Sequence, residues 1–256
     1  MNTLKWMRAL ACLVLVGGAQ VPSHAEAATD TIPHLYVIGD STASNYKEDL
    51  APRTGWAQVL QDAFDPAKLI VDNRARSGRS SKSFYDEGAW TPIADALKPG
   101  DFVFIQFGHN DSKKDDPKRY TEPATTYTEH LQRYIDETRA KGATPILVTS
   151  INRNSWNEDG TFRNSLDGYP DAMRALAKKT DTSLLDLCER TRVLYESLGQ
   201  EKTKALFMYL DKGASPNFPD GISDGTHLCL HGAKTICDLV VAELKSTSSP
   251  LAAFLK

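Results

Sequence analysis

Short apolar runs alternate with segments of helical spacing along most of this chain, and this alternation restricts the folds that it can adopt. The apolar runs lie at 35–38, 69–71, 101–107, 144–151 and 183–187. Between them, apolar residues recur at helical spacing, as at 55–64 and 127–140. Strands and helices in alternation are typical of a parallel sheet covered by helices on both faces. Because the sequence has no internal repeat and no linker-like change in composition, it predicts a single doubly wound α/β domain with a central five-stranded, mostly parallel sheet.

Three helices and one long loop are predicted in the last third of the chain. Helices are expected at 171–179, 190–198 and 231–244. Residues 201–222 start with helical character but are then interrupted by glycine and proline, so they predict a long loop over one face.

The first 25 residues have the pattern of a secretory signal peptide. Two cations precede an apolar run at 9–19, and the small residues Ser23 and Ala25 suit a cleavage site. The apolar run is too short to remain in a bilayer as a permanent helix, so no membrane anchor is expected. We therefore predict a signal peptide at 1–25, a mature domain at 26–256, and a secreted or periplasmic protein.

The charge of the chain argues against one class of partner. The formal net charge is −3, and loss of the two leader cations would take it to −5. An acidic chain without a long basic tract argues against nucleic acid as the main partner. The oligomeric state stays open, with a monomer expected.

Three cysteines remain once the leader is removed, and export would permit a disulfide between two of them. Cys229 and Cys237 are the obvious pair by sequence. However, a helix starting near residue 231 would place Cys237 about 9 Å along it, and a disulfide needs Cα atoms within about 7 Å. The pairing among Cys188, Cys229 and Cys237 therefore stays open.

A serine follows the first apolar run, which ends abruptly in Gly39-Asp40-Ser41. Ligands bind at the carboxyl ends of strands in open α/β sheets, so Ser41 is a candidate nucleophile. Asp224-Gly-Thr-His227 offers a general base and a carboxylate that could orient it in a tight turn. Gly78 and Asn110 follow the second and third apolar runs, which brings them to the same edge of the sheet. Each motif alone is consistent with an ordinary turn, but their coincidence at one edge predicts a site.

The same residues resemble the conserved blocks of a known hydrolase superfamily. The chain resembles the SGNH (GDSL-like) hydrolases at all four of their sequence blocks. In order, the matching segments are Gly39-Asp40-Ser41, Gly78, Gly108-x-Asn110 and Asp224-x-x-His227. The chain further resembles the rhamnogalacturonan acetylesterase family in a longer set of matching segments. These are Gly39–Thr42, Gly55-Trp56, Gly78–Ser80, Gln106–Asp111, and His227 with Gly232-Ala233. This resemblance covers most of the mature chain and implies a flavodoxin-like fold.

The resemblance implies a role for each matching residue. Ser41 would be the nucleophile, His227 the general base and then acid, and Asp224 the residue that orients the imidazolium. The oxyanion hole would consist of the backbone N–H groups of Ser41 and Gly78 and the side-chain amide of Asn110. No cofactor is implied, because water hydrolyses the acetyl-serine.

The implied function is that of an exported carbohydrate esterase, which removes acetyl groups from pectic polysaccharide through an acyl-enzyme. Rhamnogalacturonan is the favoured substrate, and acetylated xylan or small acetyl esters stay open. A non-catalytic carbohydrate-binding protein on the same fold is the alternative from another class, although none of the reacting positions is changed.

Basic residues surround the proposed oxyanion glycine. The cluster consists of Arg74, Arg76, Arg79 and Lys82. It is either a solvated loop or a positive patch that favours a polymer carrying carboxylates. We predict that an acetylated acidic polysaccharide contacts Arg79, Arg153 and Asn154. Trp90 and Trp156 could stack on sugar rings or pack inside the protein.

A catalytic metal is not expected. His227 and His231 are four residues apart, but Leu228 stands where the His-Glu-x-x-His pattern requires glutamate. A metal on His227 would also block its role as a base.

Overall fold

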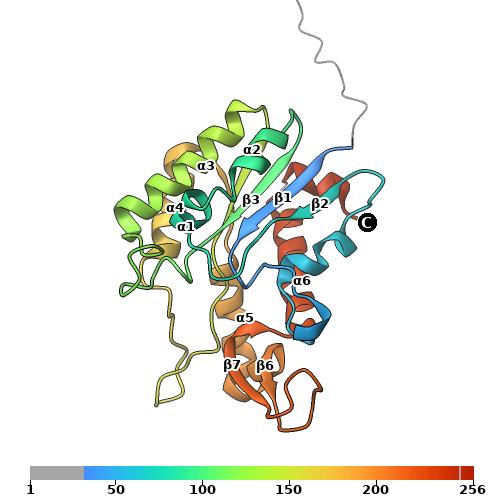
Figure 1. Ribbon diagram of the computed structural model, residues 1–256, viewed down its shortest axis with the longest axis vertical. Helices are drawn as coiled ribbons and strands as arrows, with labels where there is room; N and C mark the ends of the chain where they lie inside the picture. The colour runs from blue at the N-terminus through green and yellow to red at the C-terminus, as the bar shows by residue number, and fades with distance from the viewer. Residues whose placement is uncertain (1–31, 248) are drawn as a thin grey trace, which may run out of the picture. The chain divides into compact units, whose positions relative to one another are not determined.

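The centre of the fold is a sheet of five parallel strands. The computed structural model describes residues 32–247 and 249–256, so the predicted signal peptide at 1–25 lies outside the described residues (Figure 1). The strands are β1 (His34–Gly39), β2 (Ile70–Asn73), β3 (Phe102–Gln106), β4 (Thr144–Val148) and β5 (Ser183–Leu185). Their order is β2-β1-β3-β4-β5, and each neighbouring pair is parallel. The predicted fold class is confirmed.

Both faces of this sheet are buried, which explains why its strands are almost continuously apolar. Successive residues of a strand point to opposite faces. In β1, Leu35 and Val37 pack into one hydrophobic core, and Tyr36 and Ile38 pack into the other. The switch in strand order lies between β1 and β3, where sheets of this kind bind ligands at the carboxyl ends of the strands.

Helices close both cores, and Figure 1 shows α1 to α4 on one side of the strands and α6 on the other. One core is covered by η2, a 3-10 helix (Trp56–Ala63), with α5 (Leu187–Thr203) and α6 (Leu230–Ser246). The other is covered by α1 (Ser81–Asp86), α2 (Thr91–Ala96), α3 (Thr128–Ala140) and α4 (Tyr169–Thr180). The short turns are η1 (Glu48–Leu50), η3 (Pro123–Tyr127), η4 (Lys204–Leu206) and η5 (Pro250–Phe254).

The predicted helices are present, with some differences in type and ends. The predicted helix at 55–64 is a 3-10 helix rather than an α-helix. The helix predicted at 190–198 starts earlier, because the Asp186 side chain caps it by accepting the N–H of Glu189. It also continues past Gly199, which has a φ of 74° and interrupts the regular helix.

The helical start predicted at 201–222 is present, in the end of α5 and in η4, but the prediction of one long loop after it is wrong. Two antiparallel strands, β6 (Phe207–Leu210) and β7 (Ile222–Leu228), form a separate small sheet. The glycines and prolines of this segment lie in the connection between the two strands. β7 is rich in polar residues, so its strand character comes from pairing with β6 and not from an alternating apolar pattern.

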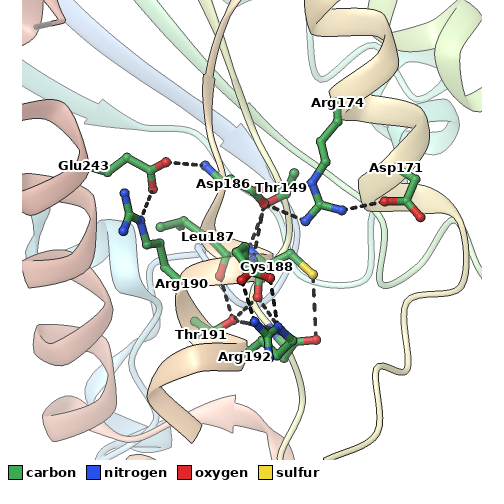
Figure 2. Close-up of polar contacts among 12 residues, drawn as sticks. Thr149, Asp171, Arg174, Asp186, Leu187, Cys188, Arg190, Thr191, Arg192 and Glu243 are labelled. Carbon is green, nitrogen blue, oxygen red and sulfur yellow. Dashed lines mark hydrogen bonds and ion pairs between the residues drawn. The ribbon is translucent and has the colours of Figure 1, made fainter. Parts of the chain in front are cut away.

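A polar network at the start of α5 holds the carboxyl ends of β4 and β5 together (Figure 2). The Asp186 carboxylate accepts hydrogen bonds from Thr149 Oγ1 at 2.9 Å and from Arg174 Nε at 2.8 Å. The Asp186 N–H donates to Glu243 Oε1 at 2.9 Å. Since Arg174 lies on α4 and Glu243 on α6, the network ties helices from both faces to this edge of the sheet.

The cysteines of the described part of the chain, Cys188, Cys229 and Cys237, are free thiols. Within residues 32–247 and 249–256, none of the helices combines the length and apolar character needed to cross a membrane.

Candidate active site

Ser41 lies in a tight turn directly after β1, and Asp40 holds that turn. The Asp40 carboxylate accepts the N–H of Thr42 at 2.9 Å and the Thr42 hydroxyl at 2.8 Å, while its carbonyl accepts the N–H of Ala43 at 3.2 Å. Gly39 precedes the turn because a side chain there would press against the backbone oxygen of Gln106 on β3. The local sequence therefore fixes the serine at the carboxyl edge of the sheet.

Asp224 and His227 lie on β7, where the pairing with β6 is irregular. Met208 pairs with Asp224 and Phe207 pairs with Leu228, so the three residues 225–227 bulge out of the ladder. The predicted tight turn is therefore a bulge within a strand. Asp224 Oδ1 stabilises it by accepting the N–H groups of Thr226 at 2.8 Å and His227 at 3.1 Å.

The bulge brings the His227 ring between Ser41 and Asp224. His227 Nε2 lies 3.0 Å from Ser41 Oγ, and His227 Nδ1 lies 2.6 Å from Asp224 Oδ2. In this arrangement one ring nitrogen can accept the serine proton while the other donates to a carboxylate, as general-base activation of a serine requires. The structure thus brings together the three residues that the sequence predicted as a triad.

The environment of Asp224 keeps its carboxylate charged. Burial alone would raise the pKa of Asp224, but the hydrogen bond and charge of His227, with the N–H groups of Thr226 and His227, outweigh burial and lower the pKa from 3.8 to about 2. Asp224 is therefore a permanent anion at neutral pH, which suits it to orient an imidazole and stabilise its protonated form.

Gly78 and Asn110 lie on loops that are linked to each other. Asn110 Nδ2 donates to the backbone oxygen of Arg79 at 3.0 Å, and the N–H of Ser81 donates to Asp111 Oδ1 at 3.0 Å. Gly78 has a φ of 78°, a conformation that favours glycine. These two links hold the loop after β2 against the loop after β3.

The predicted oxyanion donors share one cavity with the triad. Within the described part of the chain, the backbone N–H groups of Ser41 and Gly78 have no hydrogen-bond acceptor and can therefore serve a ligand. The cavity has a volume of about 500 Å³ and is lined by Ser41, Tyr46, Leu50, Arg53, Ser77, Gly78, His109, Asn110, Lys113, Arg153, Asp224, Thr226 and His227. Free N–H donors and a side-chain amide beside a serine are suited to stabilise an oxyanion.

Among the lining residues that were not predicted from the sequence, two contact the triad. Tyr46 Oη donates to the backbone oxygen of Ser41 at 2.7 Å, and its ring meets the His227 ring edge-on at 6.5 Å between centroids. The Arg53 guanidinium lies 5.7 Å from the Tyr46 ring centre and 3.6 Å from Asp224 Oδ2. No spacing or motif around either residue signals this position.

The three predicted substrate-binding residues have different surroundings. Arg153 lines the cavity. Arg79 does not, and its Nε donates to Glu87 Oε2 at 2.8 Å on the exposed surface. Asn154 is also absent from the cavity wall; its N–H donates to the backbone oxygen of Gly225 at 2.8 Å and so supports the β7 bulge.

The two tryptophans named as sugar-stacking candidates pack against protein. Trp90 is 2% exposed, and its indole N–H donates to Glu137. Trp156 is half-buried, packs edge-on against Phe162, and donates to Asn154 Oδ1 at 2.6 Å. Packing, the commoner role for a tryptophan, therefore accounts for both.

Across residues 32–247 and 249–256, no group of three or more His, Cys, Asp or Glu side chains is placed to hold an ion.

Similarity to known proteins extends over most of the chain. The GDSL-like lipase/acylhydrolase family matches residues 37–231. Rhamnogalacturonan acetylesterase RhgT of Bacillus subtilis (strain 168) is 41% identical over 217 residues, covering 85% of this chain and 91% of the relative. The probable rhamnogalacturonan acetylesterase YesY of the same organism is 39% identical, covering 85% of this chain and 95% of the relative. The crystal structure of protein YxiM from Bacillus subtilis has a TM-score of 0.73 at 29% identity, covering 86% of this chain and 58% of that one.

Proposed function

The chain belongs to the GDSL-like lipase/acylhydrolase family, in its rhamnogalacturonan acetylesterase branch, and from this premise we propose its substrate and mechanism. It is an acetylesterase. We propose that it removes acetyl groups from the rhamnogalacturonan backbone outside the cytoplasm, using Ser41, His227 and Asp224. The observation that carries the mechanism is the hydrogen-bonded row in which His227 lies 3.0 Å from Ser41 Oγ and 2.6 Å from Asp224 Oδ2.

The reaction begins with acylation of the serine. His227 Nε2 takes the proton of Ser41 Oγ as the oxygen attacks the carbonyl carbon of the acetyl ester. The negative charge that develops on the carbonyl oxygen is stabilised by the N–H groups of Ser41 and Gly78 and by the Asn110 amide. His227 then gives its proton to the departing sugar oxygen, which leaves acetyl-Ser41.

Deacylation repeats these steps with water as the nucleophile. His227 Nε2 takes a proton from water, the hydroxide attacks the acetyl carbon, and the same donors stabilise the second oxyanion. His227 returns the proton to Ser41 Oγ, and acetate is released. Asp224 stays ionised throughout, because its pKa is about 2, and it holds the imidazole with Nε2 facing the serine.

The composition of the cavity wall supports a small acyl group on a polar substrate. Leu50 is the one aliphatic side chain among the lining residues, so a long acyl chain would find little apolar surface. Three cations, Arg53, Lys113 and Arg153, lie on the same wall and suit a substrate that carries carboxylates. Both features favour acetyl groups on an acidic polysaccharide over the esters of lipids.

Acetate release tests the proposal directly. Purified enzyme is incubated with acetylated rhamnogalacturonan, acetylated homogalacturonan and acetylated xylan at equal ester concentrations, with Ser41→Ala as the control. We expect the highest kcat/KM on rhamnogalacturonan and no acetate above background from the variant. A preference for xylan would overturn the proposed substrate, and unchanged acetate release by Ser41→Ala would overturn the mechanism.

A further inference from the structure

The active-site cavity concentrates positive charge on a protein that is acidic overall. The chain has a net charge of −3, yet the cavity is lined by Arg53, Lys113 and Arg153. Asp224 is the one carboxylate among the lining residues, and it is already hydrogen-bonded to His227. The cavity wall therefore carries three cationic side chains and one carboxylate, so its positive charge is not neutralised.

Two of these cations are without an acidic partner. Arg53 lies 3.6 Å from Asp224 Oδ2, and the Arg79 side chain outside the cavity is paired with Glu87. Among residues 32–247 and 249–256, neither Lys113 nor Arg153 takes part in an ion pair, although many other lysines and arginines of the chain do. Unpaired cations on the wall of a cavity can attract and bind an anion there.

Arg153 is held in place by the protein around it. Arg153 Nη1 donates to the backbone oxygen and to the hydroxyl of Ser165, both at 3.3 Å. The preceding residue, Asn152, donates its N–H to Thr191 Oγ1 at 3.0 Å and its side-chain amide to the Cys188 carbonyl at 2.6 Å. Figure 2 shows Cys188 and Thr191 within the polar network at the start of α5. Hydrogen bonds therefore fix both the loop and the Arg153 side chain, and a guanidinium in a fixed position is suited to bind a planar carboxylate.

Lys113 lies close to the proposed oxyanion donor and lines the same cavity as Arg153. Its N–H donates to the backbone oxygen of Asn110 at 3.3 Å. Burial, followed by the nearby charges of Arg119 and Arg153, lowers the pKa of Lys113. The positive charges of Lys113 and Arg153 repel each other, and an anion bound between them would offset this repulsion.

We propose that Lys113 and Arg153 form a subsite that binds a uronate carboxylate of the sugar chain while the acetyl group lies at Ser41. The proposal rests on the proposed acetylesterase function and adds the residues that bind the negatively charged groups of the polymer. Arg153 binds the carboxylate from a fixed position, and Lys113 adds a second, more mobile charge. The same acetyl ester on a neutral sugar loses both contacts.

The neighbouring Lys114 provides a matched control. It belongs to the same exposed loop and carries the same charge, but it is not among the residues that line the cavity. Long-range attraction of an acidic polymer would be reduced equally by loss of either lysine. A specific contact would be reduced by loss of Lys113 alone.

The experiment compares acetylated rhamnogalacturonan oligomers with the same oligomers after methyl esterification of their galacturonate carboxylates. The readout is the ratio of kcat/KM for the acidic oligomer to kcat/KM for the neutral one. We expect Lys113→Gln to lower this ratio by about threefold to fivefold, the range for a partly exposed ion pair. Lys113→Gln with Arg153→Gln should lower it by about tenfold or more, because Arg153 is more buried. Lys114→Gln should leave the ratio unchanged.

Three results would overturn the proposal, and they separate it from the proposed function. Equal kcat/KM of the wild-type enzyme on acidic and neutral oligomers would remove the subsite while leaving the acetylesterase in place. An equal effect of Lys113→Gln and Lys114→Gln would show that only general attraction operates. Acetate release from neither oligomer, with cleavage of p-nitrophenyl acetate retained, would overturn the proposed polysaccharide substrate and the subsite with it.

Discussion

Replacing Asp224 by asparagine tests how much of the rate depends on its charge. The fold around residue 224 should survive, since the amide oxygen of asparagine can still accept the N–H groups of Thr226 and His227. The charge is lost, and the asparagine NH2 would then face His227 Nδ1. That contact favours the tautomer with its proton on Nε2, which cannot accept a proton from Ser41.

The pKa of Asp224 gives the order of magnitude of the loss. The surroundings lower the pKa of Asp224 from 3.8 to about 2, and this difference is equivalent to about 2.4 kcal/mol in favour of the charged form. If the imidazolium in the transition state loses that amount of stabilisation, kcat should fall about 60-fold. The unfavourable tautomer would extend the loss toward about 10⁴-fold.

The assay is kcat and KM for p-nitrophenyl acetate, with circular dichroism to verify folding. Asp220→Asn serves as the control, because this nearby carboxylate is 91% exposed and lies 4.0 Å from Lys212 at the surface. We expect full activity for Asp220→Asn. If a folded Asp224→Asn enzyme retains more than about a tenth of the wild-type kcat, the reasoning about the carboxylate is wrong.

The remaining predictions concern the oxyanion donors, the packing of α6 and the pH dependence of stability. Asn110→Ala should lower kcat by about 10²–10³-fold, less than Ser41→Ala; equal losses in the two variants would contradict the assigned role. Gly232→Ala should destabilise the protein by about 2 kcal/mol or more in urea unfolding, because a Cβ there would overlap the backbone oxygen of Leu206; an unchanged midpoint would refute this. The pKa of Asp224 is about 2 in the folded protein against an ordinary 3.8, so its stabilising contribution is present above about pH 4 and is lost as the pH falls through about 2. The stability difference between wild type and Asp224→Asn should therefore shrink by about 2 kcal/mol between about pH 5 and pH 2, and a constant difference would count against it.

The sheet and the triad could be predicted because each leaves a local signal in the sequence. Runs such as 35–38 and 101–107 are apolar on both faces of the strand, which is the pattern of a buried parallel sheet. Ser41, Gly78 and Asn110 each follow such a run, so the parallel topology places them at one edge without further information. The resemblance to the SGNH hydrolases supplied the roles.

The parts that the sequence did not predict depend on tertiary contacts. β7 contains Asp224 and His227 and is mostly polar, so its pairing with β6 and its bulge leave no apolar pattern to detect. Arg53 lies 3.6 Å from Asp224 although the two residues are far apart in the sequence, and no motif links them. Arg79 stays a prediction as a substrate contact: it is paired with Glu87 on the surface and is not among the residues that line the cavity.

Chemical labelling shows directly whether Ser41 is the nucleophile. The enzyme is treated with diisopropyl fluorophosphate, and the modified residue is located by peptide mass spectrometry while acetate release is followed in parallel. We expect one label per chain, on Ser41, with activity lost in proportion to labelling and no label on Ser41→Ala. Full activity in a completely labelled enzyme, or inactivation through a label on another residue, would contradict this role of Ser41.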